Sequence, residues 1–122
     1  MKTLCISASM RFKMDIEKAI QNFHSLGIKA LFPNLEVTET PKDPQTQQRL
    51  FWEHFAAVDA AHVLYVLNNG GYIGTSVKIE IGYALGKGKT VIFSENALER
   101  ELNALATAVI SLEHKEKLNE YL

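Results

Sequence analysis

The chain has 122 residues, of which 47% are hydrophobic and 22% are charged, and its formal net charge is −1. These values fit one compact domain with a substantial core, and they exclude a global electrostatic attraction to nucleic acid or to an anionic membrane. The single cysteine, Cys5, excludes an internal disulfide, and no apolar run approaches the roughly 18 residues of a membrane-spanning helix. We therefore expect a soluble cytoplasmic protein.

The first half of the chain alternates short apolar runs with amphipathic segments. Residues 3–7 (TLCIS) predict a strand buried on both faces, and residues 13–27 follow helical spacing up to Gly27. A second strand is predicted at 28–32, just before Pro33. Residues 33–48 hold all three prolines and predict a long loop, which leads into a helix predicted at 49–61.

The second half continues this alternation. Residues 62–69 predict the clearest strand, which a glycine-rich loop and a helix from about Ser76 to Leu85 follow. The remaining predictions are a strand at 90–94, a helix at 95–105, a strand at 107–112 and a terminal helix at 113–122. Strands that alternate with helices predict an α/β fold over residues 1–122, a single-domain doubly wound sheet of about five parallel strands, flavodoxin-like or Rossmann-like.

Ligands of such sheets bind beyond the carboxyl ends of the strands. That rule selects three segments, residues 7–12 (SASMRF), 68–76 (NNGGYIGTS) and 94–96 (SEN). In the first segment, Ser7 and Ser9 offer hydroxyls and Arg11 offers a planar fork of donors, so together they could hold one phosphate or carboxylate. A simple turn with a solvated arginine explains the same residues equally well.

The glycine-rich segment combines backbone freedom with polar side chains. Its glycines permit close approach of the backbone to a ligand, its two asparagines could hydrogen-bond a sugar or a base, and its Thr–Ser pair could cap the following helix. A generic glycine-rich turn is the simpler alternative, because neither a dinucleotide fingerprint nor a Walker loop is present. The residues concerned are Asn68, Asn69, Gly70, Gly71, Gly74, Thr75 and Ser76.

Glu80 stands near the start of a predicted helix, among apolar neighbours. A carboxylate there interacts favourably with the helix dipole, which is the plainest interpretation. The helix is apolar on two sides, however, so we expect Glu80 to be partly buried and to lean toward the strand ends. A carboxylate in that position can attack an anomeric carbon and form a glycosyl-enzyme intermediate.

Three further features bear on the site. No spacing of histidine and cysteine predicts a metal site, and we expect no cofactor. His54 attracts attention because its helix leads into the strand before the glycine-rich segment. Gly82 and Gly86 leave a strip of small residues on their helix that would let a second subunit pack closely, or that packs on the protein's own sheet.

Residues 63–93 resemble the nucleoside 2-deoxyribosyltransferase superfamily. The family's E-[LI]-G-[YR]-A signature corresponds to residues 80–84, and its "GK" before the next strand to residues 88–89. Residues 7–12 are similar to the G-S-x-R loop of the 2'-deoxynucleoside 5'-phosphate N-hydrolases, in which the Ser and the Arg hold the 5'-phosphate. The equivalents are Ser9 and Arg11, with Ala8 in place of the glycine.

The resemblance implies the fold derived above, with Glu80 as the nucleophile of N-glycosidic bond cleavage. It implies a small-molecule nucleoside or nucleotide as the partner, rather than a nucleic acid polymer or a membrane. It also implies assembly as a homodimer or a higher homo-oligomer.

The chain departs from the family at the partners of the glutamate. An Asp that the family usually carries eight residues before the strand-opening Asp aligns with His54, and the strand-opening Asp aligns with His62. The Asp of the transferases about six residues before the glutamate is Gly74, and the first-strand Tyr of the hydrolases is Cys5. Leaving-group activation would therefore need another donor, such as His54.

The sequence supports three interpretations. The first is an enzyme, a nucleoside or nucleoside 5'-monophosphate N-hydrolase or a deoxyribosyltransferase that uses Glu80. The second is a non-catalytic nucleotide-binding module of the same fold, suggested by the altered acids. The third is a cytokinin-type phosphoribohydrolase, because its PGGxGTxxE motif is similar to residues 70–80, although the spacing from Thr75 to Glu80 is two residues longer here.

Overall fold

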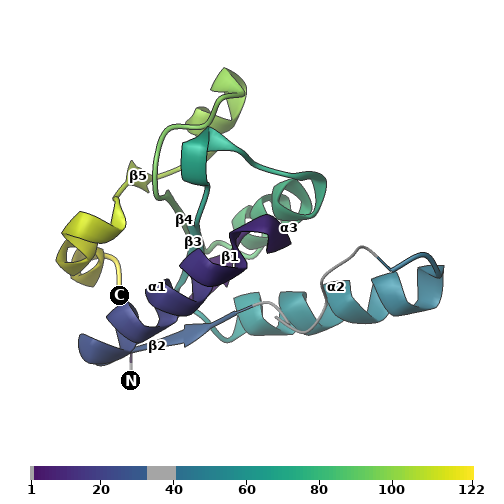
Figure 1. The fold of residues 1–122 in the computed structure, drawn as a ribbon, viewed down its shortest axis with the longest axis horizontal. Coiled ribbons are helices and arrows are strands. Elements are labelled where there is room, and N and C mark those ends of the chain that lie inside the picture. Colours follow the sequence, from purple (N-terminus) through teal and green to yellow (C-terminus); the bar gives the residue numbers. More distant parts are fainter. Residues whose placement is uncertain (1, 33–40) are drawn as a thin grey trace.

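The computed structural model describes residues 2–32 and 41–122, and it contains a five-stranded parallel sheet (Figure 1). The strand order is β2-β1-β3-β4-β5, and every neighbouring pair is parallel. This confirms the predicted α/β class and sheet. The order reverses between β1 and β3, so the crevice beyond their carboxyl ends is the expected place for a ligand. The strands are β1 (Lys2–Ser7), β2 (Ile28–Leu31), β3 (Val63–Val66), β4 (Thr90–Phe93) and β5 (Ala108–Val109).

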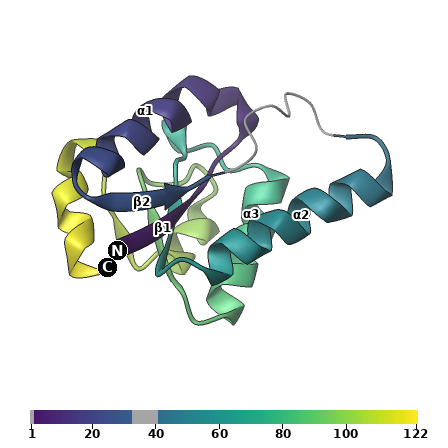
Figure 2. The same ribbon diagram turned by 90° about the horizontal axis from the view of Figure 1, so that it is seen from below.

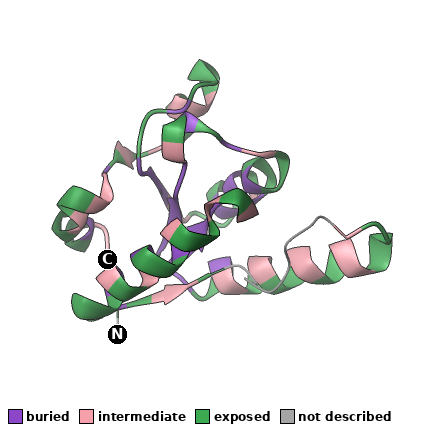
Figure 3. Ribbon diagram, viewed as in Figure 1, coloured by how far each residue is buried: buried purple, intermediate pink, exposed green. Residues whose placement is uncertain are grey.

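Helices cover both faces of the sheet (Figure 2). On one face, the sheet packs against α1 and the C-terminal η4, with Phe23 and Leu118 in the core. On the other face it packs against α2 and α3, with Val58 and Ile81 in the core. The buried residues concentrate in the central strands (Figure 3). The helices are η1 (Met10–Phe12), α1 (Lys13–Ser25), α2 (Pro44–Asp59), η2 (Asn69–Gly71), α3 (Thr75–Gly86), η3 (Arg100–Leu105) and η4 (Leu112–Glu120).

Helix α2 begins earlier than the sequence analysis predicts. It starts at Pro44 rather than at Arg49, so the loop prediction is wrong for residues 44–48, while residues 33–40 lie outside the described part of the chain. The Asp43 side chain accepts a hydrogen bond from the Thr46 amide at 2.8 Å, and Pro44 fits the first helical position because its missing N–H needs no partner there.

The last third of the chain contains 3-10 turns where α-helices were predicted. The helix predicted at 95–105 is confined to η3, and the terminal helix is η4, which is interrupted at His114. The Asn103 side chain bonds both the N–H and the carbonyl of Ala97, at 2.7 and 3.1 Å, which holds the preceding loop in a non-helical path. Within the described residues, no helix is long and apolar enough to cross a membrane.

Candidate functional site

The segments that follow β3 and β4 are joined through Asn68. Its side-chain oxygen accepts hydrogen bonds from the amide of Ser94 at 3.1 Å and from the amide of Glu95 at 3.2 Å, and its side-chain nitrogen donates to the Glu95 carbonyl at 2.7 Å. Asn68 is fully buried. It therefore ties the two loops together, and its contact with a sugar or a base stays a prediction.

The glycine loop is shaped by close backbone packing at Gly71. Gly71 has a φ of +80°, and a Cβ at this position would lie 2.8 Å from the Asn96 carbonyl oxygen and 3.0 Å from the Leu98 nitrogen. A side chain there would have to displace backbone atoms, so the position requires glycine. Gly71 thus brings the loop after β3 against the loop after β4.

The N-cap of α3 is Gly74, so the prediction that Thr75 or Ser76 caps this helix is wrong. Both residues already lie in the first helical turn and are exposed. Gly74 has extended backbone and no side chain that could bond the first-turn N–H groups. Those N–H groups therefore have no side-chain cap. Uncapped N–H groups at a helix start are able to bind an anion.

Arg11 lies against the glycine loop through Tyr72. Its guanidinium carbon is 3.9 Å from the centroid of the Tyr72 ring, and Phe12 meets the same ring edge-on at 6.3 Å. The Ser9 hydroxyl accepts a hydrogen bond from the Arg11 amide at 3.4 Å, which shapes the turn after β1. Sequence reasoning missed Tyr72, and an aromatic residue inside a glycine-rich loop was the one signal available.

Glu80 is confirmed as a buried carboxylate, with 5% of its surface exposed. One of its oxygens accepts a hydrogen bond from the Ser7 hydroxyl at 2.5 Å, and the other pairs with Nδ1 of His54. Ser7 comes from β1, His54 from α2 and Glu80 from α3. The reason expected for the burial is wrong in part, because Ile79 on the other side of α3 is 44% exposed. Glu80 is covered by β1 and α2 instead.

His54 is charged in this setting. Burial by itself lowers the pKa of its imidazole, but Cys5 and the Glu80 carboxylate outweigh that effect and raise the pKa to about 10. At neutral pH His54 is therefore an imidazolium beside Glu80. Cys5 and Ser7 share one face of β1, because alternate residues of a strand point the same way. The other ring nitrogen, Nε2, is buried and makes no hydrogen bond with a described residue.

The Ser7–His54–Glu80 cluster combines a potential nucleophile with a potential proton donor. A buried ion pair of this kind is often no more stabilising than apolar side chains of the same size, so its presence is a reason to look for a chemical role. Among residues 2–32 and 41–122, no group of three or more His, Cys, Asp or Glu side chains is placed to hold a metal ion.

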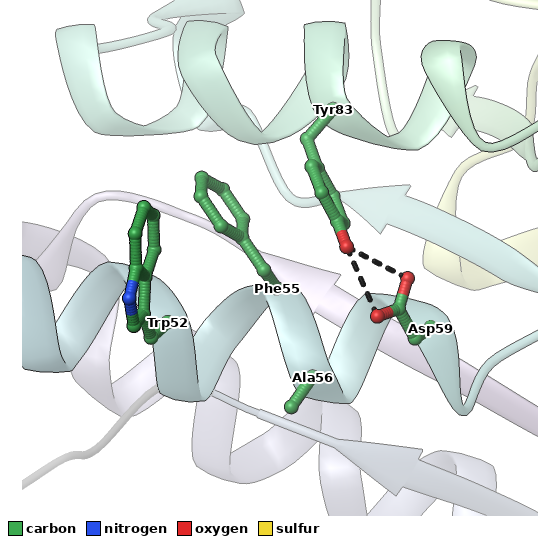
Figure 4. A pocket seen from close by; sticks show the side chains of 5 residues that line it. All are labelled: Trp52, Phe55, Ala56, Asp59 and Tyr83. Atoms are coloured by element: carbon green, nitrogen blue, oxygen red, sulfur yellow. Dashed lines mark hydrogen bonds between the residues drawn. The ribbon is translucent and has the colours of Figure 1, made fainter.

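Two hollows lie on the outer side of α2 and α3, away from this cluster. Figure 4 shows the first, where the Trp52, Phe55 and Tyr83 rings stand in a row between the two helices. The second continues along α2 toward Pro44 and Phe51. Glu80 lines neither hollow. The Glu80 side chain is buried as well, so a molecule from solvent can reach it only after local opening of the surrounding residues.

No protein-family model and no curated protein sequence matches this chain. Among solved structures, it is similar to a 2-deoxyribosyltransferase from the psychrotolerant bacterium Bacillus psychrosaccharolyticus, which is described as a biocatalyst for the synthesis of antiviral and antitumoral nucleosides. The TM-score is 0.65 at 13% sequence identity, over 91% of this chain and 88% of that one. The chain therefore has the deoxyribosyltransferase fold, as the sequence resemblance implies.

Proposed function

We propose that this protein cleaves the N-glycosidic bond of a nucleoside or a nucleoside 5'-monophosphate, with Glu80 as the nucleophile. The supporting observation is the Glu80 carboxylate, buried against Ser7 and His54 beneath the point where the strand order reverses. The deoxyribosyltransferase fold supports the same substrate class. Water as the acceptor makes the protein an N-hydrolase, and a second base makes it a transferase.

The first step forms a glycosyl ester. A Glu80 oxygen bonds to C1' of the sugar while the bond from C1' to the base nitrogen breaks, and the electron pair of that bond stays on the base. The oxocarbenium-like transition state carries positive charge, which the carboxylate stabilises. The Ser7 hydroxyl keeps the carboxylate oriented toward the site through its 2.5 Å hydrogen bond.

His54 carries the proton in this mechanism. Esterification removes the negative charge of Glu80, so the buried imidazolium loses its partner and releases a proton, which the leaving base takes. In the second step, water or an incoming base gives a proton to His54 as it attacks C1', and Glu80 leaves as the carboxylate. The site returns to its starting charges, so no other proton donor is needed.

Substrate binding is assigned to the loops around the cluster. We assign recognition of a 5'-phosphate to Arg11, Ser9 and the N–H groups at the start of α3. The missing side-chain cap at that helix start supports the assignment. The proposed substrate-binding residues are Ser7, Ser9, Arg11, Asn68, Gly71, Gly74, Thr75 and Ser76.

Release of free base tests the proposal. We expect the wild type to release base from at least one deoxynucleoside or deoxynucleoside 5'-monophosphate, as measured by liquid chromatography. The rate of base release by Glu80→Gln should fall by more than the roughly 10²- to 10⁴-fold that a general acid contributes. Glu113→Gln, at an exposed carboxylate outside the cluster, should keep wild-type activity. No release from any common nucleotide, or full activity of Glu80→Gln, would contradict the proposal.

One observation favours a second candidate, a non-catalytic nucleotide-binding module. Both Glu80 oxygens are already engaged, and the side chain is almost fully buried. This alternative predicts that nucleotides raise the Tm without being consumed. Binding should then survive Glu80→Gln and be lost in Arg11→Ala, which a thermal-shift titration with product analysis separates from catalysis.

A further inference from the structure

Tyr72 stands on a fixed stretch of backbone in the glycine loop. The carbonyl of the residue before it, Gly71, accepts a hydrogen bond from the Leu98 amide at 3.0 Å. The residue after it, Ile73, is buried in the core that lies under α2 and α3. The Tyr72 ring itself is 37% exposed. Because the backbone is held on both sides, the fold decides where this exposed ring lies.

The Tyr72 ring connects the turn after β1 with the start of α3. Arg11 lies over its face, with the guanidinium carbon 3.9 Å from the ring centroid, and Phe12 meets the ring edge-on. Phe12 in turn packs against the core on the α1 side of the sheet. The Tyr72 hydroxyl lies next to Gly74, where an added Cβ would be 3.2 Å from it. Tyr72 therefore bridges the two segments to which recognition of a 5'-phosphate is assigned.

A second contact joins the turn after β1 to the glycine loop. The side-chain nitrogen of Asn69 donates a hydrogen bond to the Asp15 carboxylate at 2.7 Å. Asp15 is the acidic residue nearest to Arg11 in sequence, and its spacing of four residues would allow an ion pair with Arg11 on a helix. The carboxylate bonds Asn69 instead, so it does not neutralise the arginine.

The contact with Tyr72 leaves the hydrogen-bond donors of Arg11 free. A cation over a ring face is attracted by the negative charge of that face, and the attraction uses no N–H group. Among the described residues, no oxygen accepts a hydrogen bond from the Arg11 guanidinium and no carboxylate pairs with it. The N–H groups lie in the guanidinium plane, where a phosphate can accept two of them in parallel. Arg11 is thus held in place and still able to bind an anion.

We propose that Tyr72 is a positioning residue for Arg11, and that it makes the site prefer a nucleoside 5'-monophosphate to the free nucleoside. This inference rests on the proposed function, which supplies the 5'-phosphate. An exposed arginine loses rotamer freedom when it binds a phosphate, and the contact with Tyr72 removes part of that freedom beforehand. Tyr72 acts through Arg11 and touches no reacting atom.

Nuclear magnetic resonance tests the contact in the absence of any ligand. The ring current of Tyr72 should move the Hδ resonances of Arg11 upfield. Tyr72→Phe keeps a ring at this position and should keep that shift, whereas Tyr72→Leu should lose it. Arg11 resonances at their ordinary position in the wild-type protein would overturn the proposal.

Calorimetric titration with the common 2'-deoxynucleoside 5'-monophosphates and their nucleosides tests the consequence. An exposed cation–π contact corresponds to about a two- to fivefold change in affinity, so Tyr72→Leu should raise the Kd of the best-bound monophosphate by that factor. Tyr72→Phe should bind it like the wild type, and the Kd of the matching nucleoside should not change in either variant. Tyr83→Leu, which removes a ring from the outer side of α3, is the matched control and should leave every Kd unchanged.

A double variant separates positioning from a general structural effect. Arg11→Ala should weaken monophosphate binding by at least about tenfold, and Tyr72→Leu added to it should cause no further loss. A Tyr72→Leu effect that persists without Arg11, or that is as large for the nucleoside, contradicts the proposal.

Failure of the proposed function gives a different result. Monophosphate binding that depends on Tyr72 and Arg11, but without release of free base, would support the positioning role and contradict the catalytic one. Release of base from nucleosides by a protein that binds no monophosphate would do the reverse. A wild-type protein that neither binds a monophosphate nor releases base would overturn both.

Discussion

At the scale of single residues, the Glu80 carboxylate owes its environment to two side chains far from it in sequence. Ser7 comes from the end of β1, and His54 comes from α2. The spacing around Glu80 predicts a shielded acid, and the structure confirms the shielding. His54 stands at the position where the family resemblance implies an aspartic acid. Because the pKa of His54 is raised to about 10, its imidazole carries a proton beside Glu80 at neutral pH.

The first prediction concerns His54 and pH. Folding raises the pKa of His54 from its usual 6.5 to about 10, so the folded protein retains a proton that the unfolded chain loses above pH 6.5. The stabilisation is therefore complete below pH 6.5 and is lost as the pH rises toward 10. Urea unfolding from pH 6 to pH 10 should show wild-type stability falling toward that of His54→Gln. Parallel pH profiles for the two proteins would contradict the expectation.

The second prediction concerns Ser7. Its hydroxyl donates to a buried, charged oxygen of Glu80, and hydrogen bonds to charged groups contribute about 1.5–3 kcal/mol. We expect Ser7→Ala to lower the free energy of unfolding by about that amount. Ser9→Ala, whose hydroxyl lies in a part-exposed turn, should change it by less than about 0.5 kcal/mol. Chemical denaturation at pH 7 measures both, and equal losses would argue against a special role for Ser7.

At the scale of elements, backbone shape decides how the loops of the site meet. Gly71 packs directly against residues 96–98, and Gly74 leaves the start of α3 without a side-chain cap. Neither role could be predicted from spacing, because each depends on a segment that only the folded chain brings near. The early start of α2, by contrast, was signalled by Asp43 and Pro44 and could have been predicted.

The third prediction compares two neighbouring glycines. Gly70 and Gly71 both have positive φ, but only Gly71 lies against backbone atoms, the nearest at 2.8 Å. Gly70→Ala should therefore cost about 1–2 kcal/mol, the penalty of a left-handed conformation. Gly71→Ala should cost clearly more, because the added methyl also displaces the Asn96–Leu98 segment. Thermal unfolding of the two variants checks this, and similar losses would show that the loop relaxes freely.

At the scale of the whole molecule, the two helices of the site also carry a row of aromatic rings on their outer sides, formed by Trp52, Phe55 and Tyr83. His54 and Glu80 point inward from α2 and α3, whereas Trp52 and Ile79 are exposed on the outer side. The apolar pattern of α3 predicts that both of its sides are covered. One side is open at Ile79, which is 44% exposed.

The fourth prediction concerns the homo-oligomer that the sequence resemblance implies. If its subunits meet on the exposed side of α2, amide hydrogen exchange in residues 45–58 should slow as the protein concentration rises. Exchange in α1, on the other side of the sheet, should not change. Mass spectrometry of peptides from the two helices measures both in one experiment. Exchange in α2 that is independent of concentration would argue against docking on this helix.

The sequence by itself determined the parallel sheet, the segments at its carboxyl edge and the fact that Glu80 is shielded, but not which elements shield it. These follow from local periodicity and from the rule that strand ends share one edge, so short-range patterns carry them. Only the tertiary structure decided that Ser7 and His54 hold Glu80, that Asn68 joins two loops, and which side of α3 stays open. Those contacts join distant parts of the chain, and packing geometry selects them from many partners that the sequence pattern allows equally.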